Sequence, residues 1–315
     1  MYFYPVTFTI SFFTAYLITP LIIKLSNKNK ILDKPDYRKK HISPISRMGG
    51  VAIVSSLILS FLFLLSLNFN QITYLDKTYL FIKLFCFLFI FLLGFLDDLK
   101  PVSPFLRLSF QFFIASISWL GIIKIEGFFL GAQYLTFDSE LLSYLCTVIW
   151  TVGVINAINW IDGMDGLLVG LTLIYSFTFS LISLLNNNPL ETLISFVIFF
   201  SCLGFLKYNK SPARIMLGDG GAYLIGFYLS NSALFSNQIP GVINPFLTVS
   251  LLFFPLIDMV RVITIRIFSG KSPFYPDRKH IHYLLLDNGI SLKKCLSIIF
   301  SLTIVFSIIN ICINI

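Results

Sequence analysis

Four short segments, at or near the ends of long apolar runs, carry acidic residues. They are Asp97 and Asp98 in "GFLDDLKPVSP", Asp162 and Asp165 in "NAINWIDGMDGLL", Asp219 in "ARIMLGDGGAYLIG" and Asp277 in "SPFYPDRKHIHYLLLDNG". Carboxylate oxygens are the ligands that hard divalent cations prefer, and nearby basic or imidazole groups can hold phosphate. This combination is typical of metal-assisted phosphoryl transfer, in which the protein mainly positions groups and neutralises charge.

The segment "NAINWIDGMDGLL" carries the strongest of these signals. Asn156, Asn159 and Asp162 are three positions apart, so a helix places them along one face at the end of an apolar run, where polar groups are costly to bury. Asp162 and Asp165 are each followed by a glycine, which lets backbone or ligand approach closely. Two carboxylates about 4 Å apart repel by roughly 4 kcal/mol at an effective dielectric near 20, so their convergence requires a cation or donor between them.

The other segments are weaker when each is taken alone. Asp97 and Asp98 could simply end a helix before the proline that follows. "GDGG" offers one carboxylate where the next helix starts and its N–H groups point outward. His280 and His282 could be solvated bystanders, but with Arg278 beside them they favour an anion-binding surface.

Composition indicates the solvent in which these segments lie. Of 315 residues, 57% are hydrophobic and 12% charged, whereas roughly a quarter are charged in a soluble domain. The mean hydropathy is +0.86. Ten apolar runs are long enough to cross a bilayer as helices: residues 3–23, 48–68, 78–96, 104–124, 141–158, 166–185, 190–206, 219–236, 245–267 and 295–313. They are continuous rather than alternating, unlike barrel strands, so the sequence predicts an all-α polytopic membrane protein with about ten transmembrane helices.

Basic residues predict the orientation of these helices. Twenty of the 23 Lys and Arg residues fall in alternate connections, chiefly 24–47 and 261–294. Short loops rich in Lys and Arg lie in the cytoplasm, so both termini are expected outside and all four acidic segments inside. The five cysteines lie in or beside apolar runs without C-x-x-C spacing, which indicates neither disulfides nor a zinc site. Residues 1–315 are expected to form a single integral-membrane domain.

Five motifs, in order, resemble the polyprenyl-phosphate N-acetylhexosaminyl-1-phosphate transferases, a glycosyltransferase family 4 type. These include the enzymes that start O-antigen (lipopolysaccharide), enterobacterial common antigen and wall teichoic acid, and the phospho-MurNAc-pentapeptide translocase. The motifs are "RMGGVAI", "FLDDLKPVSPFLRLSFQ", "NAINWIDGMDGL", "ARIMLGDGGAYLIGF" and "PFYPDRKHIH", between about residues 33 and 283.

The resemblance implies a reaction and its participants. A sugar 1-phosphate passes from a UDP-N-acetylhexosamine, such as UDP-N-acetylglucosamine, to undecaprenyl phosphate, with release of UMP and with Mg²⁺, or alternatively Mn²⁺, as cofactor. It also implies ten or eleven helices around a cytoplasmic groove in the bacterial cytoplasmic (inner) membrane, a role in cell wall or surface glycan biogenesis, no nucleic-acid partner, and a homodimer as one form of assembly.

The resemblance also implies roles for individual residues. Asp219 would be the principal metal ligand, together with Asp162, while Asp97 would act on the lipid phosphate with support from Asp98. The substrate-binding residues would be Asn156, Asn159, Asp162, Asp165, Arg47, His280, His282 and Arg278. The two histidines would hold the sugar diphosphate.

Two positions depart from the family pattern. Tyr283 stands where a third histidine is frequent, and Arg107 where lysine is common. "PDRKHIH" resembles the N-acetylglucosamine branch more than the muramyl-pentapeptide branch. A translocase-type enzyme and, in another class, a membrane transporter are the alternatives. A transporter would place ionisable groups near the bilayer midplane, and a silent scaffold would need no carboxylate clusters.

Overall fold

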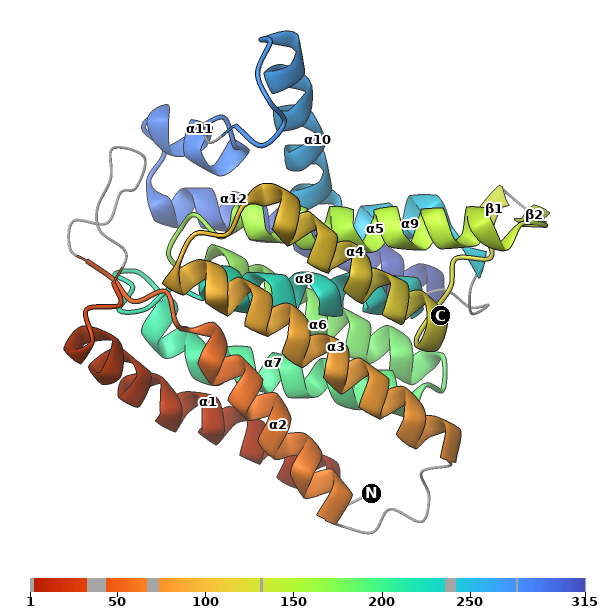
Figure 1. The fold of residues 1–315 in the computed structure, drawn as a ribbon, viewed down its shortest axis with the longest axis horizontal. Coiled ribbons are helices and arrows are strands. Elements are labelled where there is room, and N and C mark those ends of the chain that lie inside the picture. Colours follow the sequence, from red (N-terminus) through yellow and green to blue (C-terminus); the bar gives the residue numbers. More distant parts are fainter. Residues whose placement is uncertain are drawn as a thin grey trace.

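The computed structural model describes residues 3–32, 44–66, 74–130, 133–235, 242–275 and 277–314 as a helical bundle with a small sheet at one end (Figure 1). The helices are α1 (Phe3–Lys28), α2 (Gly50–Ser66), α3 (Tyr74–Leu99), α4 (Pro104–Gly121), α5 (Glu140–Ile161), α6 (Leu167–Leu185), α7 (Pro189–Asn209), α8 (Gly218–Phe235), α9 (Pro245–Leu251), α10 (Phe253–Phe268), α11 (Ile281–Asp287) and α12 (Leu292–Asn314). The strands are β1 (Gly127–Leu130), β2 (Gln133–Thr136) and β3 (Val242–Ile243).

The predicted all-α polytopic class is confirmed. Among the described residues, six helices are long and apolar enough to cross a membrane, or seven if the bent pair α9 and α10 is one span. Each predicted span overlaps at least one helix, but the count of ten crossings is not confirmed. Residues 33–43 of the basic stretch 24–47 lie outside the described residues.

The ninth predicted span, residues 245–267, is not a single unbroken helix. The chain breaks at Leu252, and α9 and α10 meet at an angle of 91°. Pro255 explains the break, because its missing N–H cannot bond to the carbonyl of Leu251 and its ring would clash with that carbonyl. As a result α10 projects away from the bundle (Figure 1).

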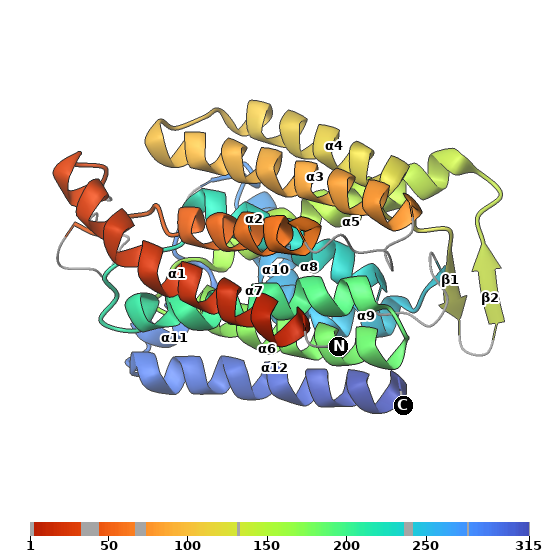
Figure 2. The same ribbon diagram turned by 90° about the horizontal axis from the view of Figure 1, so that it is seen from below.

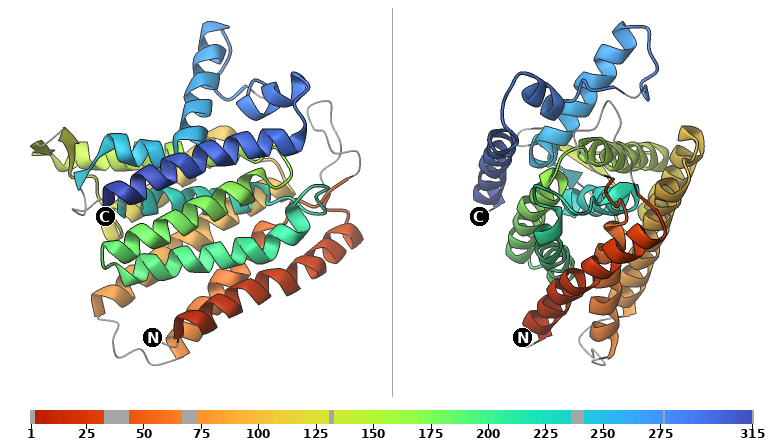
Figure 3. Two further views of the ribbon diagram at one scale, coloured as in Figure 1. Left: turned by 180° about the vertical axis from the view of Figure 1, so that it is seen from behind. Right: turned by 90° about the vertical axis from the view of Figure 1, so that its left-hand side faces the viewer.

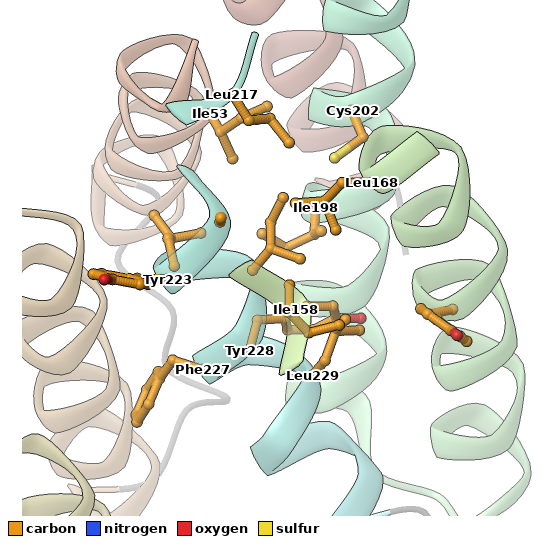
Figure 4. Close-up of a cluster of buried hydrophobic side chains, with 14 of the residues drawn as sticks. Ile53, Ile158, Leu168, Ile198, Cys202, Leu217, Tyr223, Phe227, Tyr228 and Leu229 are labelled. Atoms are coloured by element: carbon orange, nitrogen blue, oxygen red, sulfur yellow. The ribbon is translucent and has the colours of Figure 1, made fainter. Parts of the chain in front are cut away.

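Helix α8 forms the centre of the bundle. Almost every residue from Gly218 to Leu234 is buried, as expected for a helix that is apolar on all sides. Figure 4 shows Tyr223 and Phe227 of α8 among apolar side chains of neighbouring helices. Helix α8 packs along α3 and α5, while α7 packs along α1 and α6. The first residues of α8 are therefore positioned by the helices that pack around it.

The small sheet was not predicted. Strand β1 pairs antiparallel with β2 and parallel with β3. The sheet lies at one end of the bundle, and both ends of the described chain lie toward it (Figures 2 and 3). The acidic ends of α3, α5 and α8 lie at the opposite end. This arrangement agrees with an acidic face on one side and both termini on the other.

Candidate active site

Three of the acidic segments meet where α3 and α5 end and α8 begins. The Nδ2 of Asn159, in the last turn of α5, donates a 2.8 Å hydrogen bond to the Oδ1 of Asp219 in the first turn of α8. The Nη2 of Arg47, just before α2, lies 3.4 Å from the same oxygen. The structure thus brings together residues that are far apart in the sequence.

Asp98 binds the beginning of α8. Its two carboxylate oxygens accept 3.0 Å hydrogen bonds from the backbone N–H groups of Asp219 and Gly220. The first N–H groups of a helix lack partners within it and carry partial positive charge, so a carboxylate stabilises them. The outward-pointing N–H groups expected of "GDGG" therefore bind an anion of the chain itself, and Asp98 positions Asp219.

A close backbone approach fixes α3 against this same turn. A Cβ added at Gly94 would lie 2.4 Å from the carbonyl carbon and oxygen of Asp219 and 2.5 Å from the nitrogen of Gly220. At the start of α2, a Cβ on Gly50 would lie 2.4 Å from the nitrogen of Gly221. Only glycine permits such contacts. Gly94 opens the "GFLDD" motif but was not singled out from the sequence.

Asp97 lies at the corner between α3 and α4. Its Oδ2 accepts a 2.8 Å bond from the Nη1 of Arg107, and its Oδ1 accepts a 2.7 Å bond from the backbone N–H of Val102. The carboxylate is nearly buried, with 5% of the side chain exposed. Arg107, the departure from the family's lysine, thus holds Asp97 directly.

The two carboxylates of "DGMDG" have different surroundings. The pKa of Asp162 is raised to about 7, chiefly by burial. The positive charge of Arg47 and the hydrogen bond from the backbone N–H of Gly218 lower this pKa, whereas the negative charge of Asp219 raises it. Asp162 therefore belongs to the cluster around Asp219. Asp165 instead accepts a 3.0 Å bond from the N–H of Ala213, which ties it to the segment before α8.

A cavity of about 230 Å³ adjoins this cluster. Its lining includes Arg107, Asn156, Asn159, Trp160, His280 and Tyr283. The Nδ2 of Asn156 donates to the Oε1 of Gln111 at 2.7 Å, which joins α5 to α4 at the cavity wall. The cavity therefore lies between Asp97 on one side and the "PDRKHIH" segment on the other.

The segment before α11 is held onto α10 by charge pairs. Arg266 binds both oxygens of Asp277 at 3.0 and 3.1 Å, and its guanidinium lies 4.9 Å from the ring of Trp160. Burial raises the pKa of Asp277, but the bonds from Arg266 and from the N–H of Lys279 outweigh it and leave that pKa lowered. Phe274, Tyr275, Asp277 and His280 form one wall of the cavity.

The two histidines occupy different positions. The Nδ1 of His280 lies 2.7 Å from the Oδ2 of Asp258, and His280 lines the cavity. His282 is fully buried behind it, with the rings stacked at 5.6 Å. Burial lowers the pKa of His282 to about 3, so it is neutral at neutral pH. Within the described residues, neither of its ring nitrogens has a hydrogen-bond partner.

Arg278 and Tyr283 stand beside these histidines. Arg278 pairs with Asp287 at 2.8 Å and lies 4.7 Å from the ring of Tyr283. The Oη of Tyr283 donates a 3.3 Å bond to the carbonyl of Gly163. Tyr283, in place of the family's third histidine, thus connects α11 to the "DG" turn.

Most of the predicted site residues fall into two groups, which the structure brings side by side. One cluster holds Asp97, Asp98, Asn159, Asp162, Asp219 and Arg47, and the adjoining cavity is lined by Asn156, Asn159 and His280. Asp165, His282 and Arg278 belong to neither group. In the part of the chain that the structure describes, no three His, Cys, Asp or Glu side chains are arranged to hold one metal ion. Sequence reasoning missed Asp258. It is an acidic residue inside an apolar run, and such a position itself indicates a functional role.

Comparison with known proteins places the chain in a family. Residues 80–237 match glycosyl transferase family 4. The chain is 32% identical over 314 residues to a Bacillus subtilis protein named probable undecaprenyl-phosphate N-acetylglucosaminyl 1-phosphate transferase, covering 96% of this chain and 83% of the relative. It is 32% identical to the Thermotoga maritima undecaprenyl-phosphate alpha-N-acetylglucosaminyl 1-phosphate transferase, over 94% and 86% of the two chains. It is 33% identical to the Haemophilus influenzae protein of that name, over 92% of this chain and 81% of the relative. The chain belongs to glycosyl transferase family 4.

Proposed function

We propose that this protein transfers N-acetylglucosamine 1-phosphate from its UDP-sugar to undecaprenyl phosphate and releases UMP, which starts a lipid-linked surface glycan. The observation that carries the proposal is the convergence of Asp97, Asp98 and Asp219 at the ends of α3 and α8, beside a polar cavity. The names of the relatives supply the sugar and the lipid. The end of a buried helix is where a lipid phosphate can meet a water-soluble nucleotide.

The charges of the cluster suit a divalent cation. Four carboxylates, those of Asp97, Asp98, Asp162 and Asp219, face the guanidinium groups of Arg47 and Arg107. The carboxylates therefore outnumber the guanidinium groups, and the cluster carries a net negative charge. Mg²⁺ is usually held by one or two carboxylates together with substrate phosphates and water, so Asp219 and Asp162 would hold it once the UDP-sugar is present. The ion would neutralise charge on the oxygens of the transferred phosphoryl group.

Protein groups would align the two phosphates. Arg107 and Arg47 would attract them, while Asp97 would orient the acceptor oxygen. A phosphate monoester has a second pKa near 6 and is largely ionised at neutral pH, so little proton removal is needed. The acceptor oxygen forms a bond to the β-phosphorus as the bond to the UMP oxygen breaks, and UMP leaves with the electron pair. His280, on the cavity wall, would contact the sugar or its diphosphate.

The site would face the cytoplasm of a bacterial cell, in the cytoplasmic membrane. The excess of Lys and Arg in alternate connections supports this orientation. UDP-sugars are cytoplasmic substrates, which agrees with it.

The proposal is tested with the purified protein in lipid nanodiscs supplied with undecaprenyl phosphate. We expect UMP release and a lipid product with UDP-N-acetylglucosamine, loss of both in excess chelator, and recovery with Mg²⁺ or Mn²⁺. Turnover of UDP-MurNAc-pentapeptide alone would favour the translocase alternative. Absence of lipid-dependent UMP release with every UDP-N-acetylhexosamine would refute the proposal, and full activity in chelator would refute the metal.

Gly94→Ala should lower kcat by about 100-fold, because a misplacement of about 1 Å at a reacting centre has effects of that size. The added methyl group collides with the backbone of Asp219. Gly153→Ala on α5 is the matched control, since a Cβ there meets nothing within 4 Å. Equal kcat values for the two variants would show that the close approach of α3 to α8 is not needed.

A further inference from the structure

Two charged side chains lie fully buried at the end of the bundle remote from the candidate site. The Nζ of Lys83 on α3 pairs with the Oε1 of Glu191 in the first turn of α7, and their side chains are 0% and 1% exposed. The Oη of Tyr79 donates to the same glutamate oxygen. The Oγ of Ser232 on α8 donates to its other oxygen at 3.4 Å. The proposed reaction uses none of these groups.

Stability alone does not account for such a pair. The loss of hydration of two buried charges offsets much of their attraction, so neutral residues of similar volume often give an equally stable protein. Ionisable side chains within membrane-spanning helices are rare and usually functional. The best-attested role of a buried polar group is to specify the register of helices.

The position of the pair suits that role. Helices α3 and α8 pack along one another in opposite directions. At the site end, Asp98 binds the N–H of Asp219, and at the far end Glu191 joins Lys83 to Ser232. At 1.5 Å per residue, these contacts are about 22 Å apart along α3 and about 20 Å apart along α8.

We propose that the Lys83–Glu191 pair fixes the axial position of α3 against α7 and α8, and thereby keeps Asp97 and Asp98 in place beside Asp219. The contacts between the two ends include Phe87 against Phe227, with centroids 5.6 Å apart. Such apolar contacts are non-directional and permit small shifts, whereas a buried charge pair does not. Lys83 and Glu191 are positioning residues, and their effect on turnover rests on the proposed function.

A distance measurement tests the fixed position without reference to activity. Spin labels are placed at exposed Lys100, after α3, and at exposed Arg214, before α8, in a chain whose exposed Cys312 is serine. The Lys83→Met/Glu191→Gln double variant removes both charges. We expect a narrow distance distribution in the parent and a broader or displaced one in the double variant. An unchanged distribution would overturn the proposal. A changed distribution in a protein without transferase activity would refute the proposed function and not the role of the pair.

Kinetics separate positioning from stability. Lys83→Met and Glu191→Gln, made singly, each leave one buried charge without its partner and should lower Tm. The double variant should regain most of the lost Tm. We nevertheless expect kcat of the double variant to stay about 10-fold to 100-fold below the parent, with the KM for UDP-N-acetylglucosamine unchanged. Recovery of kcat together with Tm would show that the pair serves stability alone. Leu302→Ala, at an exposed position on α12, is the control for a substitution remote from both helix ends.

Discussion

Asp219→Asn is expected to abolish turnover while leaving the protein folded. The carboxylate of Asp219 is the meeting point of the cluster: it contacts Asn159 and Arg47, and its backbone N–H is held by Asp98. Asparagine keeps the shape and one acceptor oxygen but removes the charge that would hold Mg²⁺. Removing one preorganised electrostatic group typically lowers kcat by about 10² to 10³, and loss of the ion should add to this.

The measurement is UMP release at saturating substrates across a Mg²⁺ titration, with Tm recorded in parallel. An acidic residue in the first turn of a helix contributes about 0.3–1 kcal/mol, so Tm should change little. Asp138→Asn, at an exposed carboxylate beside the sheet, is the matched control and should retain full activity. Near-normal kcat in Asp219→Asn, with unchanged Mg²⁺ dependence, would remove Asp219 from the metal site.

Asp97→Asn should lower kcat by about 10² to 10⁴ and leave UDP-sugar binding nearly intact. Asp97 closes α3 where a lipid phosphate can approach, and it holds Arg107 through a 2.8 Å bond. Its amide variant loses the charge that binds Arg107 and that would orient the acceptor oxygen. Asp165→Asn, by contrast, should weaken nucleotide binding, because Asp165 organises the segment at Ala213 rather than the acceptor side.

Calorimetric affinity for UDP-N-acetylglucosamine, measured alongside kcat, separates these two roles. The expected pattern is normal affinity with low kcat for Asp97→Asn, and reduced affinity for Asp165→Asn. The reverse pattern, in which Asp97→Asn loses nucleotide binding but keeps kcat at saturation, would mean that the two assignments are exchanged.

The sequence predicted that the acidic segments lie at one face, because the succession of apolar runs and the positions of basic residues assign these segments to one side of a membrane. Asn159 and Asp219 are expected at the same face on this ground, and the structure joins them at 2.8 Å. The helical spacing of Asn156 and Asn159 also predicts that they share one face of α5. Neither signal says which helix lies next to which, so the binding of Asp98 to the start of α8 was not predicted.

Other features depend on contacts that a single sequence does not display. The need for glycine at position 94 arises from the approach of α8, which begins more than a hundred residues later. The break at Leu252 had a local signal in Pro255, but the surrounding apolar run masked it. Lys83 and Glu191 likewise stand out as charges beside or within apolar runs, yet only the fold shows that they pair.

We expect the protein to transfer a sugar phosphate rather than a sugar. The decisive experiment uses UDP-N-acetylglucosamine labelled at the β-phosphate together with undecaprenyl phosphate, and follows the label into the lipid phase. The label should enter the lipid, with one UMP released for each labelled lipid formed. Release of UDP that retains the label, with an unlabelled glycolipid, would contradict this expectation.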